Sequence, residues 1–151
     1  MKLAEALTLR ADRKKRIEQL KQRILRNAKV QEGEFPAEDP EELIKEMEKI
    51  SDELVELIQR INRTNSNTEI KKGITLSDAI ATRDIFVLKT SVYRDLAQTA
   101  TITHDIRTKS EVKFKGTVKV PQIQERADQI AKAHRELDTK IQEMNWKTEL
   151  Q

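Results

Sequence analysis

The chain contains no cysteine, and glycine, proline and aromatic residues are scarce. The absence of cysteine excludes disulfides, thiolate metal ligands and cysteine nucleophiles. Glycine occurs only at Gly33, Gly73 and Gly116, so the sequence has no glycine-rich phosphate-binding loop. The longest uninterrupted apolar run, from Ile85 to Leu88, is far too short to span a membrane. Together with the absence of a secretory signal in the first residues, these features lead us to expect a cytoplasmic protein.

Residue types that carry out catalysis or hold metals are present, but without the required spacing. His104 and His134 have no histidine or carboxylate-rich partner motif at metal-binding spacing. A dinuclear site in a helix bundle needs Glu-x-x-His on two helices, which the sequence lacks, and no nucleophile elbow is present. The sequence therefore predicts a protein that is not an enzyme and has no metal or cofactor, and from these residues we infer no small-molecule ligand.

Helices with narrow apolar stripes are what the composition favours, because 36% of the residues are hydrophobic and 36% are charged. Asp39 followed by Pro40 and Glu42 is typical of a helix start, as is Thr75 with Asp78. We predict an all-α fold, an antiparallel four-helix bundle or coiled-coil hairpins, in a single domain. The predicted helices cover residues 3–27, 41–63, 76–100 and 121–146.

The predicted helices differ in how their apolar residues are arranged. The second has an unbroken heptad-like stripe and should be the most buried; its members are Leu43, Met47, Ile50, Leu54, Leu57 and Ile61. The third has a second apolar edge, through Ile85, Val92 and Leu96, which indicates contact with more than one neighbour.

Between the third and fourth predicted helices, the helical period disappears. Val112, Phe114, Val118 and Val120 alternate with polar residues around residues 115–116, which predicts a short β-hairpin or strand within residues 108–120. An isolated hairpin is marginal in water, so its apolar face needs a cover. We therefore regard Val112, Phe114 and Val118 as candidate interface residues, with Phe114 as the anchor.

Charge is distributed unevenly, although the net charge is only +3. Residues 1–29 contain ten Lys or Arg and three acidic residues, whereas residues 30–56 contain eleven acidic residues and two Lys. We expect the basic side of the first helix to meet the acidic side of the second, as flanking charges do in coiled coils. The alternative is a nucleic-acid surface, for which the five scattered aromatic residues provide no stacking platform.

Two arginines continue the apolar register of the first helix, where guanidinium groups need partners. If the fourth helix runs antiparallel to the first, Arg10 falls level with Asp138 and Arg13 level with His134. A pair between Arg10 and Asp138 would then fix the register; alternatively both arginines reach solvent. At the same end of the predicted bundle lie Asn62, Asn65, Asn145 and Trp146. They form either a ligand-binding end or helix caps and turns.

Six short segments spread over nearly the whole chain carry distinctive combinations of residues. They read VQEGE at 30–34, EDPEEL at 38–43, RINRTN at 60–65, LSDAIATRD at 76–84, SEVKF at 110–114 and LDTKIQEMNW at 137–146. In this order they resemble a bacterial family of small uncharacterised helical proteins known as septicolysin. The resemblance implies a cytoplasmic-type bacterial protein with no established reaction and no catalytic residues. We infer no haemolytic activity from the name, because thiol-activated cytolysins are β-rich and contain cysteine.

Self-association is the function that these features favour most. Narrow stripes on four helices bury little apolar area in a monomer, and an exposed strand edge invites pairing with another chain. The sequence thus predicts a structural or interaction protein that forms homo-oligomers. An RNA-binding helical arm is the alternative, and a membrane-active protein using its basic first helix is a third hypothesis.

Overall fold

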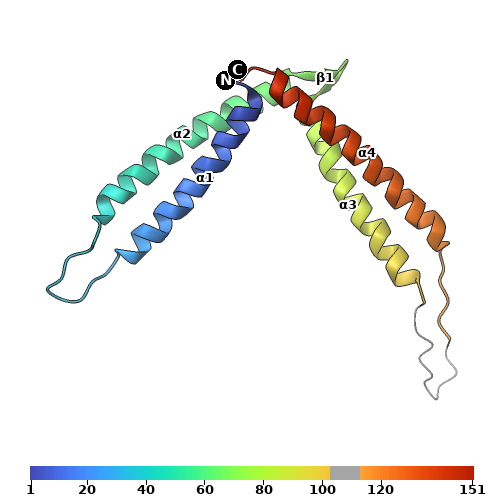
Figure 1. Ribbon diagram of the computed structural model, residues 1–151, viewed down its shortest axis with the longest axis horizontal. Helices are drawn as coiled ribbons and strands as arrows, with labels where there is room; N and C mark the ends of the chain where they lie inside the picture. Colours follow the sequence, from blue (N-terminus) through green and yellow to red (C-terminus); the bar gives the residue numbers. More distant parts are fainter. Residues whose placement is uncertain (103–112) are drawn as a thin grey trace. The chain divides into compact units, whose positions relative to one another are not determined.

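The computed structural model describes residues 1–102 and 113–151, and it is all-α apart from one small β-hairpin. This confirms the predicted fold class, and none of the helices described is long and apolar enough to cross a membrane. Figure 1 labels the elements. They are α1 (Leu3–Arg26), α2 (Pro40–Asn67), β1 (Glu69–Lys71), β2 (Ile74–Thr75), α3 (Leu76–Ala100) and α4 (Val120–Lys147).

Both helix starts predicted from capping residues are confirmed. The Asp39 side chain accepts a hydrogen bond of 3.0 Å from the Glu41 backbone N–H, and Pro40 is the first residue of α2. At the start of α3, Thr75 Oγ1 accepts from the Asp78 N–H while the Asp78 carboxylate accepts from the Thr75 N–H, which is a capping box. These bonds hold the pKa of Asp78 below its ordinary value, chiefly through the Thr75 backbone N–H.

The second helix continues four residues beyond its predicted end at residue 63. Thr64 is fully buried, and its hydroxyl donates to the Arg60 carbonyl at 2.9 Å and accepts from the Gln151 N–H at 2.9 Å. Tertiary contacts therefore keep a polar stretch helical, against the weak helix propensity of Asn and Thr.

The β-hairpin lies in a different place from the one predicted. Strands β1 and β2 pair between α2 and α3, through a turn in which Gly73 has a φ of +77° that only glycine adopts easily. Residues 113–119 contain no strand, so the predicted β element is wrong there; its part at 108–112 lies outside the described residues. Alternating valines did not suffice for a strand, because among the described residues no second strand pairs with residues 113–119.

The chain divides into two compact units. The first contains Met1–Glu69 and Gln142–Gln151, and the second contains Ile70–Ile141. Helix α4 therefore contributes its last residues to the first unit and its remainder to the second. The prediction of a single domain stays a prediction.

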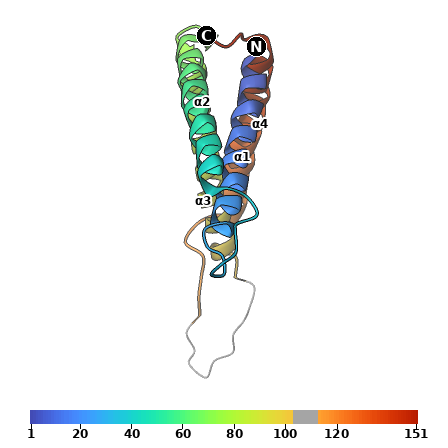
Figure 2. The same cartoon turned by 90° about the vertical axis from the view of Figure 1, so that its left-hand side faces the viewer.

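In the first unit, α1 and α2 form an antiparallel hairpin and lie side by side in both views (Figures 1 and 2). Leu20, Leu43 and Ile50 form the centre of one apolar cluster, and partly buried Ile17, Ile24 and Met47 pack against it. Nearer the other end of the hairpin, Leu3, Ala6, Leu54, Leu57 and Ile61 are buried.

The chain ends of this unit pair with each other. The Leu3 N–H donates to the Thr148 carbonyl and the Leu150 N–H to the Met1 carbonyl, both at 2.9 Å. Lys2 Nζ lies 2.5 Å from the Glu149 carboxylate, and this contact lowers the pKa of Glu149. The segment after α4 is thereby fixed beside the start of α1.

In the second unit, α3 pairs with α4. Arg83 of α3 donates to Asp138 of α4 at 3.0 Å, and the residues of α3 on the same side as Arg83 include buried Ala79, Thr90 and Ala97. On α4, Ile123, Ala127 and Ile141 are buried. Small side chains thus fill much of this contact.

We expect Leu20→Ala to lower the free energy of unfolding by about 2–5 kcal/mol, because it removes a fully buried side chain of the first unit. Leu25→Ala is the matched control on the same helix, since Leu25 is 59% exposed; its effect should stay within about 0.5 kcal/mol. Denaturant titration of each purified variant measures both. Equal losses would show that α1 is not packed as described.

Candidate functional site

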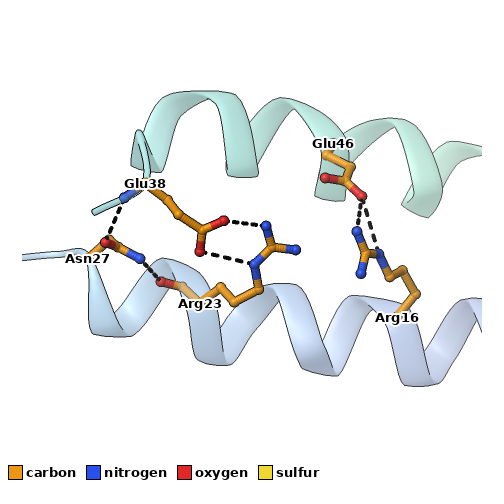
Figure 3. Close-up of polar contacts among 5 residues, drawn as sticks. All are labelled: Arg16, Arg23, Asn27, Glu38 and Glu46. Atoms are coloured by element: carbon orange, nitrogen blue, oxygen red, sulfur yellow. Dashed lines mark hydrogen bonds and ion pairs between the residues drawn. The ribbon is translucent and has the colours of Figure 1, made fainter. Parts of the chain in front are cut away.

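One side of the α1–α2 hairpin carries ion pairs between the two helices. Arg16 Nε and Nη2 both donate to Glu46 Oε1, at 3.2 and 2.6 Å, and Arg13 Nη2 lies 2.8 Å from Glu53 Oε2. Near the loop, Arg23 forms a bidentate ion pair with Glu38, through Nε and Nη2 (Figure 3). We call this the ion-paired side. It confirms that the basic side of the first helix meets acidic residues of the second.

Asn27 joins the end of α1 to the segment that leads into α2. Its side-chain N–H donates to the Arg23 carbonyl at 2.8 Å, and its Oδ1 accepts from the Glu38 N–H at 3.1 Å (Figure 3). The Arg23 guanidinium, chiefly through its hydrogen bond, lowers the pKa of Glu38, and Glu38 in turn raises the pKa of Arg23. The loop is thus held at the end of α1 by hydrogen bonds to backbone groups and by an ion pair.

These pairs contribute modestly to stability. The side chains of Arg23, Glu38, Arg16 and Glu46 remain between 28% and 41% exposed, and water weakens ion pairs that are this accessible. Their main effect is on the register of the hairpin, because opposite charges determine which residues of α1 lie beside which residues of α2.

In the structure, Arg13 and Asp138 have other partners than the ones that we predicted. Arg13 pairs with Glu53, and Asp138 accepts from Arg83 at 3.0 Å. The predicted partner assignment of Asp138 to Arg10 is therefore wrong. It assumed that the first helix packs along the fourth, whereas the observed helix hairpins are α1 with α2 and α3 with α4.

The predicted polar end is only partly brought together. Asn145 is buried and Asn65 half-buried, while Asn62 and Trp146 are exposed. The Oδ1 atoms of Asn65 and Asn145 have no hydrogen-bond partner within the described part of the chain. Nearby, the chain itself satisfies other polar groups of α2: Arg60 and Asn67 donate to Gln151 at 3.1 and 2.8 Å. These contacts favour the interpretation as caps and turns.

His134 lines an open groove of about 400 Å³ between α3 and α4. Its lining also includes Thr90, Arg94, Asp95 and Arg135, so positive and negative groups are mixed. Within residues 1–102 and 113–151, no three His, Cys, Asp or Glu side chains are grouped as metal ligands would be.

Helix α3 buries Leu76 at its start, but beyond that residue its buried positions hold small side chains while four larger aliphatic ones are exposed. Ile85, Leu88, Val92 and Leu96 are 49%, 62%, 65% and 36% exposed. Their spacing of three, four and four residues places them along one side of the helix, which we call the α3 stripe. A contiguous apolar surface of this kind marks interaction sites in soluble proteins. This stripe contains the second apolar edge predicted from the sequence.

The candidate interface in the segment before α4 is only partly covered within the described chain. Phe114 is largely exposed and Val118 half-buried, while Val112 lies outside the described residues. The proposed anchoring role of Phe114 thus stays a prediction.

Sequence reasoning overlooked Arg83, which links α3 to α4 and also donates to Asp84 at 3.0 Å. Its desolvation opposes the charged form, but the hydrogen bonds to Asp84 and Asp138 leave its pKa raised. The spacing could have identified it. Arg83 lies four residues after Ala79 and seven before Thr90, so it falls on the same side of the helix as the buried positions Ala79, Thr90 and Ala97 and needs a partner there.

Residues 10–150 match the model of a family of unknown function, DUF6847. The crystal structure of a functionally unknown conserved protein from Corynebacterium diphtheriae is similar along the full length, with 45% identity and a TM-score of 0.93. The similarity covers 100% of this chain and 99% of that one. No curated protein matches. These findings confirm an uncharacterised family, and neither description mentions septicolysin.

We expect Glu38→Gln to destabilise the protein most at neutral pH and progressively less in acid. Arg23 lowers the pKa of Glu38 in the folded state, so the pair stabilises the fold above the ordinary Glu pKa near 4.5 and this contribution is lost as pH falls through the lowered value. Urea midpoints of wild type and variant between pH 7 and pH 2 should therefore converge.

Glu48→Gln is the matched control, because it removes an exposed carboxylate from α2, the helix that begins two residues after Glu38. A difference between wild type and Glu38→Gln that stays constant down to pH 2 would contradict the role assigned to the Arg23–Glu38 pair.

Proposed function

The chain belongs to DUF6847, a family of unknown function, and on that premise we propose that it is a non-enzymatic helical protein that associates with itself through the α3 stripe. The observation that supports this proposal is the exposure of aliphatic side chains along α3. After Leu76, which is buried at the start of the helix, the buried positions are Ala79, Thr90 and Ala97, whereas four large aliphatic side chains are exposed.

Burying these aliphatic side chains is the driving force for association. Fully burying one Val, Leu or Ile side chain is worth about 1.5–3 kcal/mol relative to leaving it exposed. Four such residues over one stretch of helix therefore provide several kcal/mol, against which the cost of lost rotational and translational freedom must be set. A helix with apolar residues repeating every three to four positions is the usual element for helix-to-helix association. We also propose a cytoplasmic location, as expected from the sequence.

The contacts of α1 make RNA binding the weaker alternative. Arg13 and Arg16 pair with glutamates of α2, and Arg23 pairs with Glu38 in the segment before it, so their charges are already compensated. Phosphate binding would have to break these pairs or rely on the remaining basic residues. We therefore keep RNA binding as an outcome to be measured, through its steep dependence on salt.

We expect wild-type protein to sediment as an oligomer at tens of micromolar, and Val92→Glu to sediment as a monomer. A carboxylate at the middle of the α3 stripe would be buried without a partner on association, which is strongly unfavourable. Analytical ultracentrifugation measures the change, with circular dichroism to check that helicity is kept.

Val87→Glu is the matched control on the same helix. Val87 is 54% exposed and Val92 65% exposed, but five residues separate them, so they point to different sides of α3. The control should keep the wild-type mass. A monomeric wild type, or two variants with the same mass, would overturn the proposal.

A further inference from the structure

We propose that the α3 stripe of one copy binds the side of the α1–α2 hairpin opposite its ion pairs, which we call the open side, on a second copy. This inference rests on the proposed function and adds to it the identity of the partner surface. Three observations carry it: a second stripe on both helices of the hairpin, complementary charge, and matching charge spacing.

On α1, a second stripe runs beside the one that is buried against α2. It contains Arg10, Lys14, Ile17, Lys21 and Ile24, at alternating spacings of three and four residues. Ile17 and Ile24 are partly buried against the core cluster, while Lys14 and Lys21 are exposed. This stripe thus combines aliphatic side chains with a basic edge.

On α2, a corresponding stripe lies on the flank away from Glu46 and Glu53. Its members are Ile44, Met47, Ser51, Val55 and Ile58, of which Val55 is exposed and the others are half-buried. Since α1 and α2 are antiparallel, the flanks of both helices opposite the ion pairs lie on one side of the hairpin. The open side is therefore an aliphatic strip with basic residues along its α1 edge.

The α3 stripe has the opposite charge on its edge. Asp84 and Asp95 are both exposed, and eleven residues at 100° each return to nearly the same direction, so they follow one edge of the stripe. The contacts from Arg83 to Asp84 go to a single oxygen, Oδ1. An acidic edge on an apolar helix face complements a basic edge on an apolar groove.

The charges are also spaced alike. Arg10 and Lys21 are eleven residues apart, as are Asp84 and Asp95, and eleven residues of α-helix extend about 16.5 Å. Two ion pairs can therefore form together when α3 lies along α1, with Ile17 between them on one side and Leu88 and Val92 on the other. In the part of the chain that the structure describes, Val55 of the open side and Val92 of the α3 stripe remain 54% and 65% exposed. A second copy provides both surfaces reciprocally, as a two-fold dimer requires.

The test uses two charge-reversed versions of the full chain. The basic-edge variant carries Arg10→Glu with Lys21→Glu, and the acidic-edge variant carries Asp84→Lys with Asp95→Lys. Each alone places like charges together at both interfaces of the dimer, so we expect self-association to weaken by at least about a hundredfold. A one-to-one mixture should recover the wild-type mass. In a mixed dimer, one interface pairs the two reversed edges and the other pairs the two unchanged edges, so opposite charges meet at both.

The matched control is Lys15→Glu with Arg26→Glu, which reverses two exposed basic residues of α1 at the same spacing but outside the open side. It should keep the wild-type mass. Ultracentrifugation at low and moderate salt gives the masses, and circular dichroism verifies the helix content of every variant.

The outcomes separate this inference from the proposed function. If Val92→Glu is monomeric but the basic-edge variant associates like wild type, the α3 stripe is an interface and the open side is not its partner. If both reversed variants dissociate but their mixture does not reassociate, the pairing of the two edges is wrong. A monomeric wild type overturns both proposals.

Discussion

Two helices packed side by side can bury only the stripe of each that faces the other, and most features of this structure follow from that constraint. In the first unit, the facing stripe of α2 holds large aliphatic residues such as Ile50, Leu54 and Ile61, which are buried. Apolar residues on a second side of a helix stay at the surface of a two-helix hairpin. The charged residues between the stripes then decide which helices meet, because the ion pairs of Arg13, Arg16 and Arg23 form along one side only.

The parts of the fold that were predictable are those determined by neighbouring residues. Asp39 before Pro40, and Thr75 three residues before Asp78, fix helix starts through side-chain to backbone hydrogen bonds within one turn. The buried face of α2 followed from its regular aliphatic period. The meeting of basic and acidic flanks also followed, because a short connection forces consecutive helices to fold back on each other.

What could not be predicted depends on which distant elements meet. Assigning Asp138 to Arg10 required knowing the neighbour of α4, and periodicity does not supply it; the structure pairs Asp138 with Arg83. The continued helix at Thr64 depends on Gln151, 87 residues away along the chain. The hairpin at β1 and β2 contains so few residues that its alternation could not be told from a turn. Asn145 is buried, and its Oδ1 has no partner within the described chain; the sequence pattern gives no reason for its burial.

The small residues on the buried side of α3 set the balance between folding and association in the second unit. Ala79, Thr90 and Ala97 let a neighbouring helix approach closely, but at about 25 cal/mol per Å² they contribute far less on burial than the aliphatic side chains exposed on the opposite side. The polar pair of Arg83 with Asp138 adds direction and little apolar area. Since the apolar area that this helix does not bury in the hairpin is the area available to a partner, covering the α3 stripe would stabilise the second unit while it joins two copies. Binding of this kind raises the stability of the folded chain by mass action, so the two properties increase together with protein concentration.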